Sequence, residues 1–159
     1  MSQLLELLQK NARQTNAELA ELLGRDEAAV TAELTELEKD GTIMGYTAIL
    51  DPERHEPNKA TAMIEIRLSP ERGGGFDRLA HRVAAFPEVK SCFLMSGTYD
   101  LLAIVEGEDL REVARFVSET LSTMSGILST ATHFQLKTYK ANGLLQSSER
   151  EMDRLPVSP

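Results

Sequence analysis

The sequence predicts an α+β protein built from two domains. Leucines at helical spacing dominate residues 1–50, whereas the chain from residue 59 to 140 alternates between strand-like and helix-like patterns. The intervening residues 51–58 are mostly polar and include two prolines, which is typical of a linker. The unbroken apolar run from Leu101 to Val105 predicts a strand that is covered on both faces. Helices of the same chain can cover one face, and we expect a second subunit to cover the other.

The composition is that of an ordinary globular protein, with 42% apolar and 26% charged residues among 159. Its apolar runs are far shorter than the roughly 20 residues that span a bilayer, and its first residues lack the basic region of a secretory signal. The single cysteine, Cys92, excludes an intramolecular disulfide framework and fits a reducing cytoplasm. The scattered histidines have no metal-ligand spacing. We therefore expect a cytoplasmic protein without a membrane partner, metal or cofactor.

Residues 1–50 predict three short helices followed by an extended segment. The first leucines have helical spacing, a capping box at Thr15–Glu18 begins a second helix, and Gly24 ends that helix. Asp26 can cap a third helix, and residues 42–50 predict a strand pair. This order of elements is that of a winged helix-turn-helix domain. Another small three-helix unit is the alternative.

The third predicted helix is the one that enters DNA in such a domain. Its apolar side is formed by Val30, Leu34 and Leu37, so the opposite side faces solvent. Residues 1–50 carry four basic residues against nine acidic ones, a net charge of −5, and the whole chain carries −8. Because Lys and Arg contacts to phosphate supply much of the affinity for DNA, this domain is expected to bind DNA with a weak electrostatic component. The candidate DNA-contacting residues are Arg25, Ala28, Thr31, Ala32, Thr35 and Lys39.

Residues 59–140 predict the element order βαββαβ. Apolar side chains alternate along the first strand, a tight turn joins the second and third strands, and Asp109 can cap the second helix. This is the order of a ferredoxin-like sandwich, whose helices cover one face of the sheet. The predicted strands lie at 62–68, 89–95, 101–105 and within 127–139, and the predicted helices at 76–86 and 109–121. Leu110, Val113, Phe116, Val117 and Leu121 are the expected apolar side of the second helix, and Thr130, Thr132, Phe134 and Leu136 the expected shared face of the last strand.

Two further segments are interpreted from their composition. The glycine run at 73–75 is predicted to be a flexible loop, because it lies outside any phosphate-loop context. Residues 141–159 are polar and are predicted to be a frayed tail, with a short packed helix as the alternative. The apolar residues that permit such a helix are Leu144, Leu145, Met152 and Leu155.

Two motifs carry the most specific information. Residues 37–46 are Leu-Glu-Lys-Asp-Gly-Thr-Ile-Met-Gly-Tyr, and residues 96–102 are Ser-Gly-Thr-Tyr-Asp-Leu-Leu. The first is similar to the Leu-Glu-x-x-Gly-x-Ile-x-Gly-Tyr run of the Lrp/AsnC family of bacterial and archaeal transcriptional regulators, and the second resembles that family's Gly-Asp-Tyr-Asp turn. The resemblance covers about Leu4 to Lys140. It implies a sequence-specific DNA-binding regulator with a winged helix-turn-helix and a RAM-type ferredoxin-like domain. An enzyme is a formal competitor, because ferredoxin-like sheets host many chemistries, but the sequence offers no nucleophile–base pair, metal cluster or phosphate-binding loop, so we expect no enzyme activity.

The same resemblance implies an effector and an assembly. Family members form homodimers through the sheets of the second domain, often assemble further to tetramers or octamers, and hold an amino acid or similar small effector between subunits. The turn at 96–100 matches the family's pocket turn, and residues 129–132 match a segment that a neighbouring subunit contributes in some members. The implied effector-binding residues are Met95, Gly97, Thr98, Tyr99, Asp100, Ser129, Thr130 and Thr132.

Two departures from the family pattern leave alternatives open. Ala32, Glu33 and Glu36 stand where family members usually carry basic residues, so the alternative is an effector-sensing or assembly protein with weakened or lost DNA binding. Thr98 replaces the usual aspartate of the turn, which leaves Asp100 to meet an ammonium group. The turn residues can also be purely structural. We expect Asp100→Ala to abolish an effector response while leaving the dimer intact.

Overall fold

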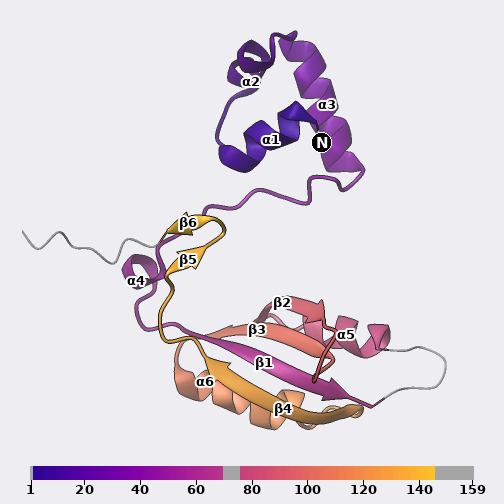
Figure 1. The fold of residues 1–159 in the computed structure, drawn as a ribbon, viewed down its shortest axis with the longest axis vertical. Coiled ribbons are helices and arrows are strands. Elements are labelled where there is room, and N and C mark those ends of the chain that lie inside the picture. Colours follow the sequence, from indigo (N-terminus) through magenta and orange to yellow (C-terminus); the bar gives the residue numbers. More distant parts are fainter. Residues whose placement is uncertain (1, 70–75, 146–159) are drawn as a thin grey trace, which may run out of the picture. The chain divides into compact units, whose positions relative to one another are not determined.

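The computed structural model describes residues 2–69 and 76–145. The chain divides into two units between Ile49 and Leu50 (Figure 1). The glycine run at 73–75, Met152 and Leu155 lie outside the described residues, so the expectations for them stay predictions. Within the described ranges, every helix is too short or too polar to cross a bilayer.

The first unit is a three-helix domain with its own small core. Its helices are α1 (Gln3–Lys10), α2 (Asn16–Leu23) and α3 (Glu27–Lys39) (Figure 1). Each contributes at least one buried side chain, and the core consists of Leu4, Leu19, Ala20, Val30 and Leu34. Leu37 packs against this core while partly exposed, so the predicted apolar side of the third helix is confirmed.

The predicted helix ends of this unit are confirmed in detail. The Thr15 hydroxyl accepts a hydrogen bond from the Glu18 backbone N–H at 3.2 Å, and the Glu18 carboxylate accepts one from the Thr15 N–H at 2.7 Å. Gly24 ends α2 with φ +62°, a left-handed conformation that favours glycine. Asp26 caps α3 by accepting hydrogen bonds from the N–H groups of Ala28 and Ala29. These local signals therefore fix the turn between α2 and α3.

The predicted strand pair at 42–50 is absent. Residues 44–50 are extended but lie in no strand, and their large apolar side chains are exposed, with Met44 at 95% and Leu50 at 53%. A strand needs a neighbour for its N–H and C=O groups, and the described part of the chain supplies none to this segment. The predicted linker 51–58 contains a helical turn, α4 (Pro52–His55), in which the Asp51 carbonyl accepts hydrogen bonds from the N–H groups of Arg54 and His55.

The second unit contains the predicted βαββαβ order. Its antiparallel sheet has the strand order β2-β3-β1-β4, so β1 lies between β3 and β4. The elements are β1 (Ala60–Leu68), α5 (Asp77–Ala84), β2 (Val89–Leu94), β3 (Leu101–Gly107), α6 (Leu110–Arg115), the π-helix η1 (Phe116–Leu121) and β4 (Ile127–Phe134) (Figure 1). Asp109 caps α6 by accepting a hydrogen bond from the Glu112 N–H at 2.8 Å.

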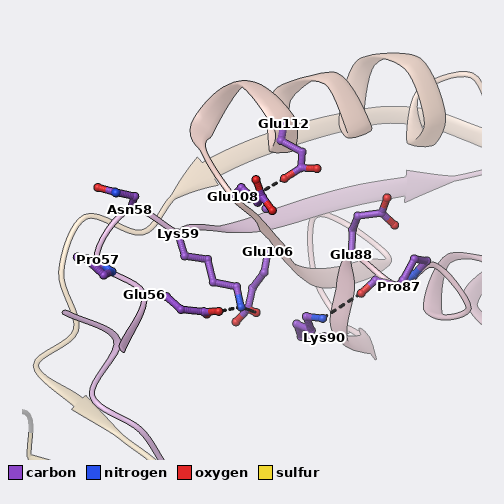
Figure 2. A pocket seen from close by; sticks show the side chains of 11 residues that line it. Glu56, Pro57, Asn58, Lys59, Pro87, Glu88, Lys90, Glu106, Glu108 and Glu112 are labelled. Carbon is purple, nitrogen blue, oxygen red and sulfur yellow. Dashed lines mark hydrogen bonds and ion pairs between the residues drawn. The ribbon is translucent and has the colours of Figure 1, made fainter. Parts of the chain in front are cut away.

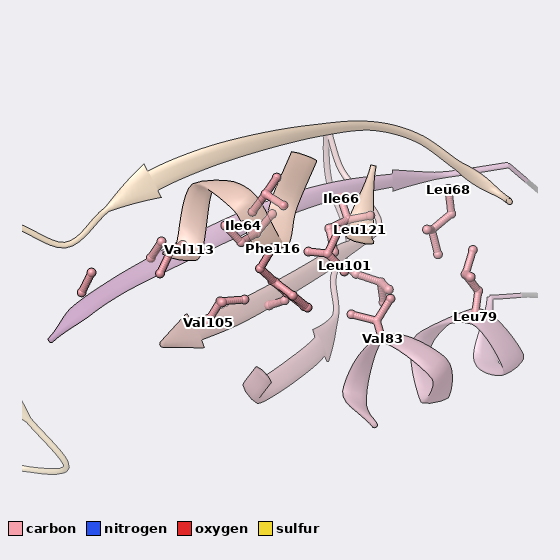
Figure 3. Packing of buried hydrophobic residues seen from close by; sticks show 14 residues of the cluster. Ile64, Ile66, Leu68, Leu79, Val83, Leu101, Val105, Val113, Phe116 and Leu121 are labelled. Atoms are coloured by element: carbon pink, nitrogen blue, oxygen red, sulfur yellow. The ribbon is translucent and has the colours of Figure 1, made fainter. Parts of the chain in front are cut away.

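The helices cover one face of this sheet. Figure 3 shows Ile64 and Ile66 of β1 and Leu101 of β3 packing toward Val83 of α5 and Phe116 of η1, all of them buried. Two side chains expected in this layer are not there. Leu110 is 57% exposed because it is the first residue of α6, and Leu136 is 96% exposed because β4 ends at Phe134.

The opposite face of the sheet, called the open face below, is uncovered by the described chain. Residues of β3 alternate between fully buried and half-buried, although the run Leu101 to Val105 is entirely apolar. Leu102 and Ile104 point to the open face, where they are flanked by Phe93 at 49% and Met63 at 40% exposure. The expected cover on this side is therefore not supplied by the described residues. The open-face side chains include Met63, Glu65, Arg67, Ser91, Phe93, Leu102, Ile104, Ser129, Ala131 and His133.

Residues 140–145 form a β-hairpin, which corrects the expected tail or helix over this stretch. Strand β5 (Lys140–Ala141) pairs with β6 (Leu144–Leu145). Asn142 and Gly143 join them with φ of +50° and +82°. Positive φ at both central residues is the requirement of a type I′ turn, and Asn-Gly satisfies it.

Candidate functional site

The exposed side of α3 is one candidate site. All six candidate DNA-contacting residues are exposed, and Ala28, Ala32 and Lys39 lie on the side of the helix opposite to Val30 and Leu34. Thr31 and Thr35 lie at the flank of this surface, where their hydroxyls already make hydrogen bonds. The Thr31 hydroxyl accepts from the Asn16 amide at 3.0 Å, and the Thr35 hydroxyl donates to the Thr31 carbonyl at 2.9 Å.

Both cations of this surface are paired with carboxylates of the same helix. Arg25 Nη1 lies 2.6 Å from Glu33 Oε2, and Lys39 Nζ lies 3.6 Å from Glu36 Oε1. The hydrogen bond from the Arg25 guanidinium lowers the pKa of Glu33, so this carboxylate stays charged. The surface is thus nearly neutral, and most of its side chains are small. Such side chains can contact base edges by shape, but they offer little charge for phosphates.

Lowering the pH is expected to loosen the first unit. The pKa values of Glu18, Glu33 and Asp40 are all lowered, mainly by hydrogen bonds that their carboxylates accept from Thr15, Arg25 and Thr42. The stabilisation is therefore complete above the ordinary pKa of about 4 and is lost as the pH falls through the lowered folded-state pKa. Amide exchange in α2 and α3, corrected for its intrinsic pH dependence, should accelerate as the pH falls below about 4. The Glu33→Gln variant should lose part of this dependence, and an unaltered pH profile in it would contradict the role given to the Arg25 ion pair.

The connection between β2 and β3 is the second candidate site. Its ends are closed by the Met95 N–H, which donates to the Asp100 carbonyl at 2.8 Å. Asp100 also ties the connection to β1, because its N–H donates to the Ile66 carbonyl at 3.0 Å and its Oδ2 accepts from the Leu68 N–H at 2.7 Å. Asp100 is only half-buried, so its carboxylate stays in reach of solvent. One carboxylate oxygen therefore has a structural role.

Between these anchors lies a run of unpaired backbone donors. In residues 2–69 and 76–145 nothing accepts a hydrogen bond from the N–H groups of Ser96, Gly97, Thr98 and Tyr99. Gly97 has φ +147°, a conformation that side-chain-bearing residues rarely adopt, although a Cβ there would meet nothing within 4 Å. Glycine is thus required by the backbone angle, not by crowding. Consecutive free N–H groups beside one carboxylate suit a small molecule that carries both an anionic and a cationic group.

The sheet brings β4 close to this turn, with β1 between them. Ile66 pairs with Leu101 on one side and with Thr130 on the other, a separation of two strand spacings, or about 10 Å. Thr130 and Thr132 point to the helix side, where the Thr130 hydroxyl lies 3.3 Å from that of Ser122. Ser129, opposite Arg67, points to the open face. Within one chain, the three candidate β4 residues therefore do not share a face.

A cavity of about 500 Å³ lies at the other end of the same strands (Figure 2). Lys59, just before β1, contacts Glu56 at 2.6 Å and Glu106 at 3.1 Å, and the Lys90 ammonium donates to the Pro87 carbonyl. The hydrogen bond with Glu56, more than that with Glu106, raises the pKa of Lys59. These contacts hold the segment before β1 against the sheet. The described residues include no cluster of metal-binding side chains.

Two family models match this chain. Residues 2–44 match a winged helix-turn-helix DNA-binding domain, and residues 61–145, more than half of the chain, match the Lrp/AsnC ligand-binding domain. The chain belongs to the Lrp/AsnC family of transcriptional regulators. The predicted fold class, the winged helix-turn-helix followed by a ferredoxin-like domain, is confirmed, as is the expectation of a regulator rather than an enzyme.

Relatives of known name support the same conclusion. YugG of Bacillus subtilis, an uncharacterized HTH-type transcriptional regulator, is 39% identical over 99% of this chain and 96% of its own length. The leucine-responsive regulatory protein of Haemophilus influenzae is 28% identical over 89% of this chain and 85% of its own. A Neisseria meningitidis transcriptional regulator, crystallised with L-methionine, is 30% identical with a TM-score of 0.68, covering 87% of this chain and 88% of that one. An Agrobacterium tumefaciens member is 26% identical with a TM-score of 0.72, covering 92% and 97%.

The Lrp/AsnC motifs locate the turn in the sequence, but they do not reveal its neighbours. Arg67, which strand alternation places on the outward side of β1, lies across from Asp100, because Asp100 bonds to both Ile66 and Leu68. Strand alternation alone cannot show this, since it fixes which face a residue occupies and not which strand lies beside it.

Proposed function

We propose that this Lrp/AsnC regulator is a cytoplasmic homodimer that binds DNA through α3 and responds to an amino acid or similar effector held at the Ser96–Asp100 turn. The observation that carries the effector proposal is the row of four free N–H groups beside the Asp100 carboxylate. The N–H groups suit a carboxylate, and the Asp100 oxygen that does not bond to Leu68 suits an ammonium group. L-Methionine in the Neisseria relative makes apolar amino acids the first effectors to test.

The open face is the proposed dimer surface. Phe93, Leu102, Ile104 and Met63 form an apolar patch across three adjacent strands. A sheet face of this kind, exposed on a regulator that must present two recognition helices to DNA, fits a second copy of the same face. Further assembly to a tetramer or octamer is part of the proposal, with Ser129, Thr130 and Thr132 available to a neighbouring subunit's effector site.

One alternative follows from the charges on α3. Since Arg25 and Lys39 are both paired with glutamates, few cations remain free for phosphates. This favours, as the second candidate, an effector-sensing or assembly protein that keeps the fold but binds DNA weakly. The two candidates differ in whether a specific DNA complex survives physiological salt.

Removing the carboxylate of Glu36 is expected to strengthen DNA binding. Glu36 is exposed beside Lys39 on the side of α3 proposed to face DNA. Glu36→Gln should raise DNA affinity by about three- to tenfold and steepen the salt dependence by about one released counterion, because Lys39 becomes free for a phosphate. Glu119→Gln, the same change on exposed η1, is the control and should alter neither value. Equal behaviour of the two variants in a salt-titrated shift assay would argue against α3 as the DNA-contacting surface.

The proposed function is tested by mapping genomic binding sites and then repeating a shift assay with the twenty amino acids. We expect a specific complex at about 150 mM salt whose stability changes with at least one amino acid. A complex seen only at very low salt would support the second candidate. If no amino acid binds at all, the effector proposal is wrong.

A further inference from the structure

The effector turn has a cationic neighbour that no motif assigns to it. Arg67 is the open-face residue of β1 between Ile66 and Leu68, and Asp100 bonds to both of these residues, so Arg67 lies directly opposite Asp100. The neighbours of Arg67 on β1, Ile66 and Leu68, are buried, which fixes its own side chain on the open face. The backbone of Arg67 therefore lies beside the end of the turn, and its exposed side chain starts from the open face.

This guanidinium has no ion-pair partner among the described residues. The nearby open-face carboxylate, Glu65, lies 3.3 Å from the His133 imidazole, and the Asp100 carboxylate accepts the hydrogen bond of the Leu68 N–H. The backbone adjoining Arg67 is also irregular, since the β1–β4 register shifts between Arg67 and Leu68. Such bulges are frequent next to binding sites, where they redirect a side chain. The extra residue on β4, Leu128, is 67% exposed.

We infer that Arg67 binds the carboxylate of the effector and restricts the ligand to α-amino acids with a free carboxyl group. An arginine fork can donate two parallel hydrogen bonds to a carboxylate, and the free N–H groups of Gly97 and Thr98 supply further donors from the turn. The ammonium group is then left to Asp100. This inference rests on the proposed effector function and adds a residue that selects for the free carboxylate: amides and decarboxylated amines bind more weakly because they leave the guanidinium unpaired.

The test measures binding of each of the twenty amino acids to the full-length protein by titration calorimetry, and then of the tightest-binding one and its carboxamide to variants. Arg67→Gln should weaken binding of the acid between about tenfold and a hundredfold while leaving carboxamide binding unchanged. Arg67→Lys keeps the charge but lacks the two-pronged guanidinium, so its affinity for the acid should lie between those of the wild type and Arg67→Gln. Arg82→Gln on α5, an exposed arginine in the helix layer, is the matched control and should bind like the wild type.

Each possible result supports or contradicts the proposed role of Arg67. Equal losses for the acid and the carboxamide, or no loss for either, would overturn the role of Arg67 while leaving effector binding at the turn in place. A weakened dimer in size-exclusion chromatography with unchanged acid affinity would assign Arg67 to the interface instead, and would also overturn it. No binding of any amino acid to the wild type would remove the proposed effector function and, with it, this inference.

Discussion

Replacing Ile104 by aspartate is expected to break the proposed homodimer into monomers. Ile104 lies on the open face, half-buried, with Met63 as its partner on β1 and Ser91 as its partner on β2. A carboxylate there would be desolvated in each subunit by the opposing sheet, at a cost of several kcal/mol per ion. We expect the dimer dissociation constant to rise by at least about a hundredfold, measured by analytical ultracentrifugation.

A substitution to aspartate in the helix layer provides the control. Ala114 is exposed on α6, in the layer that covers the opposite face of the sheet, and Ala114→Asp should leave the dimer unchanged. Far-ultraviolet circular dichroism should show that both variants remain folded, because neither residue belongs to the buried core. An Ile104→Asp protein that sediments as the wild-type dimer would show that subunits associate through another surface.

The expectation of a covered third strand was only half met within the chain, and the reason is physical. An apolar run predicts burial on both faces, but it carries no information on whether the cover comes from the same chain or from a partner. Helices α5, α6 and η1 cover the face of the sheet that carries Leu101 and Val105. The face that carries Leu102 and Ile104 is not covered by the described residues.

Local signals predicted helix ends better than strand partners. The capping box at Thr15 and the cap at Asp26 were confirmed because each involves hydrogen bonds over two or three residues. The strand pair at 42–50 was wrong because pairing depends on a distant segment that the pattern does not specify. The hairpin at Asn142–Gly143 was missed although Asn-Gly is a strong hairpin signal, since the two strands it joins are only two residues each.

The candidate site was predictable where a motif marked it and unpredictable where only the sheet register assembled it. The turn residues Gly97 to Asp100 could be named from sequence alone. The structural role of Asp100, beside its proposed contact to the effector, depends on the 2.7 Å hydrogen bond that it accepts from the Leu68 N–H, across a separation of 32 residues. No local pattern encodes such a contact, and it changes what a substitution at Asp100 can be expected to show.

Asp100→Asn is expected to separate the structural role of this side chain from its proposed role in effector binding. Asparagine keeps a carbonyl oxygen that can accept the Leu68 N–H but lacks the charge that meets an ammonium group. We expect the free energy of unfolding to change by less than about 1 kcal/mol, while effector affinity falls by about tenfold or more. Titration calorimetry with the effector and urea unfolding measure the two quantities on the same preparation.

Asp100→Ala removes both the contact to Leu68 and the proposed contact to the effector, so it refines the expectation drawn from the sequence. Leu68 is 3% exposed, so its N–H would be left without an acceptor, at a cost of about 1 to 3 kcal/mol. A loss of effector response in this variant alone would not distinguish a missing ammonium partner from a displaced turn. If Asp100→Asn binds effector like the wild type while Asp100→Ala does not, Asp100 serves only to hold the turn against β1, and the ammonium group must be bound elsewhere.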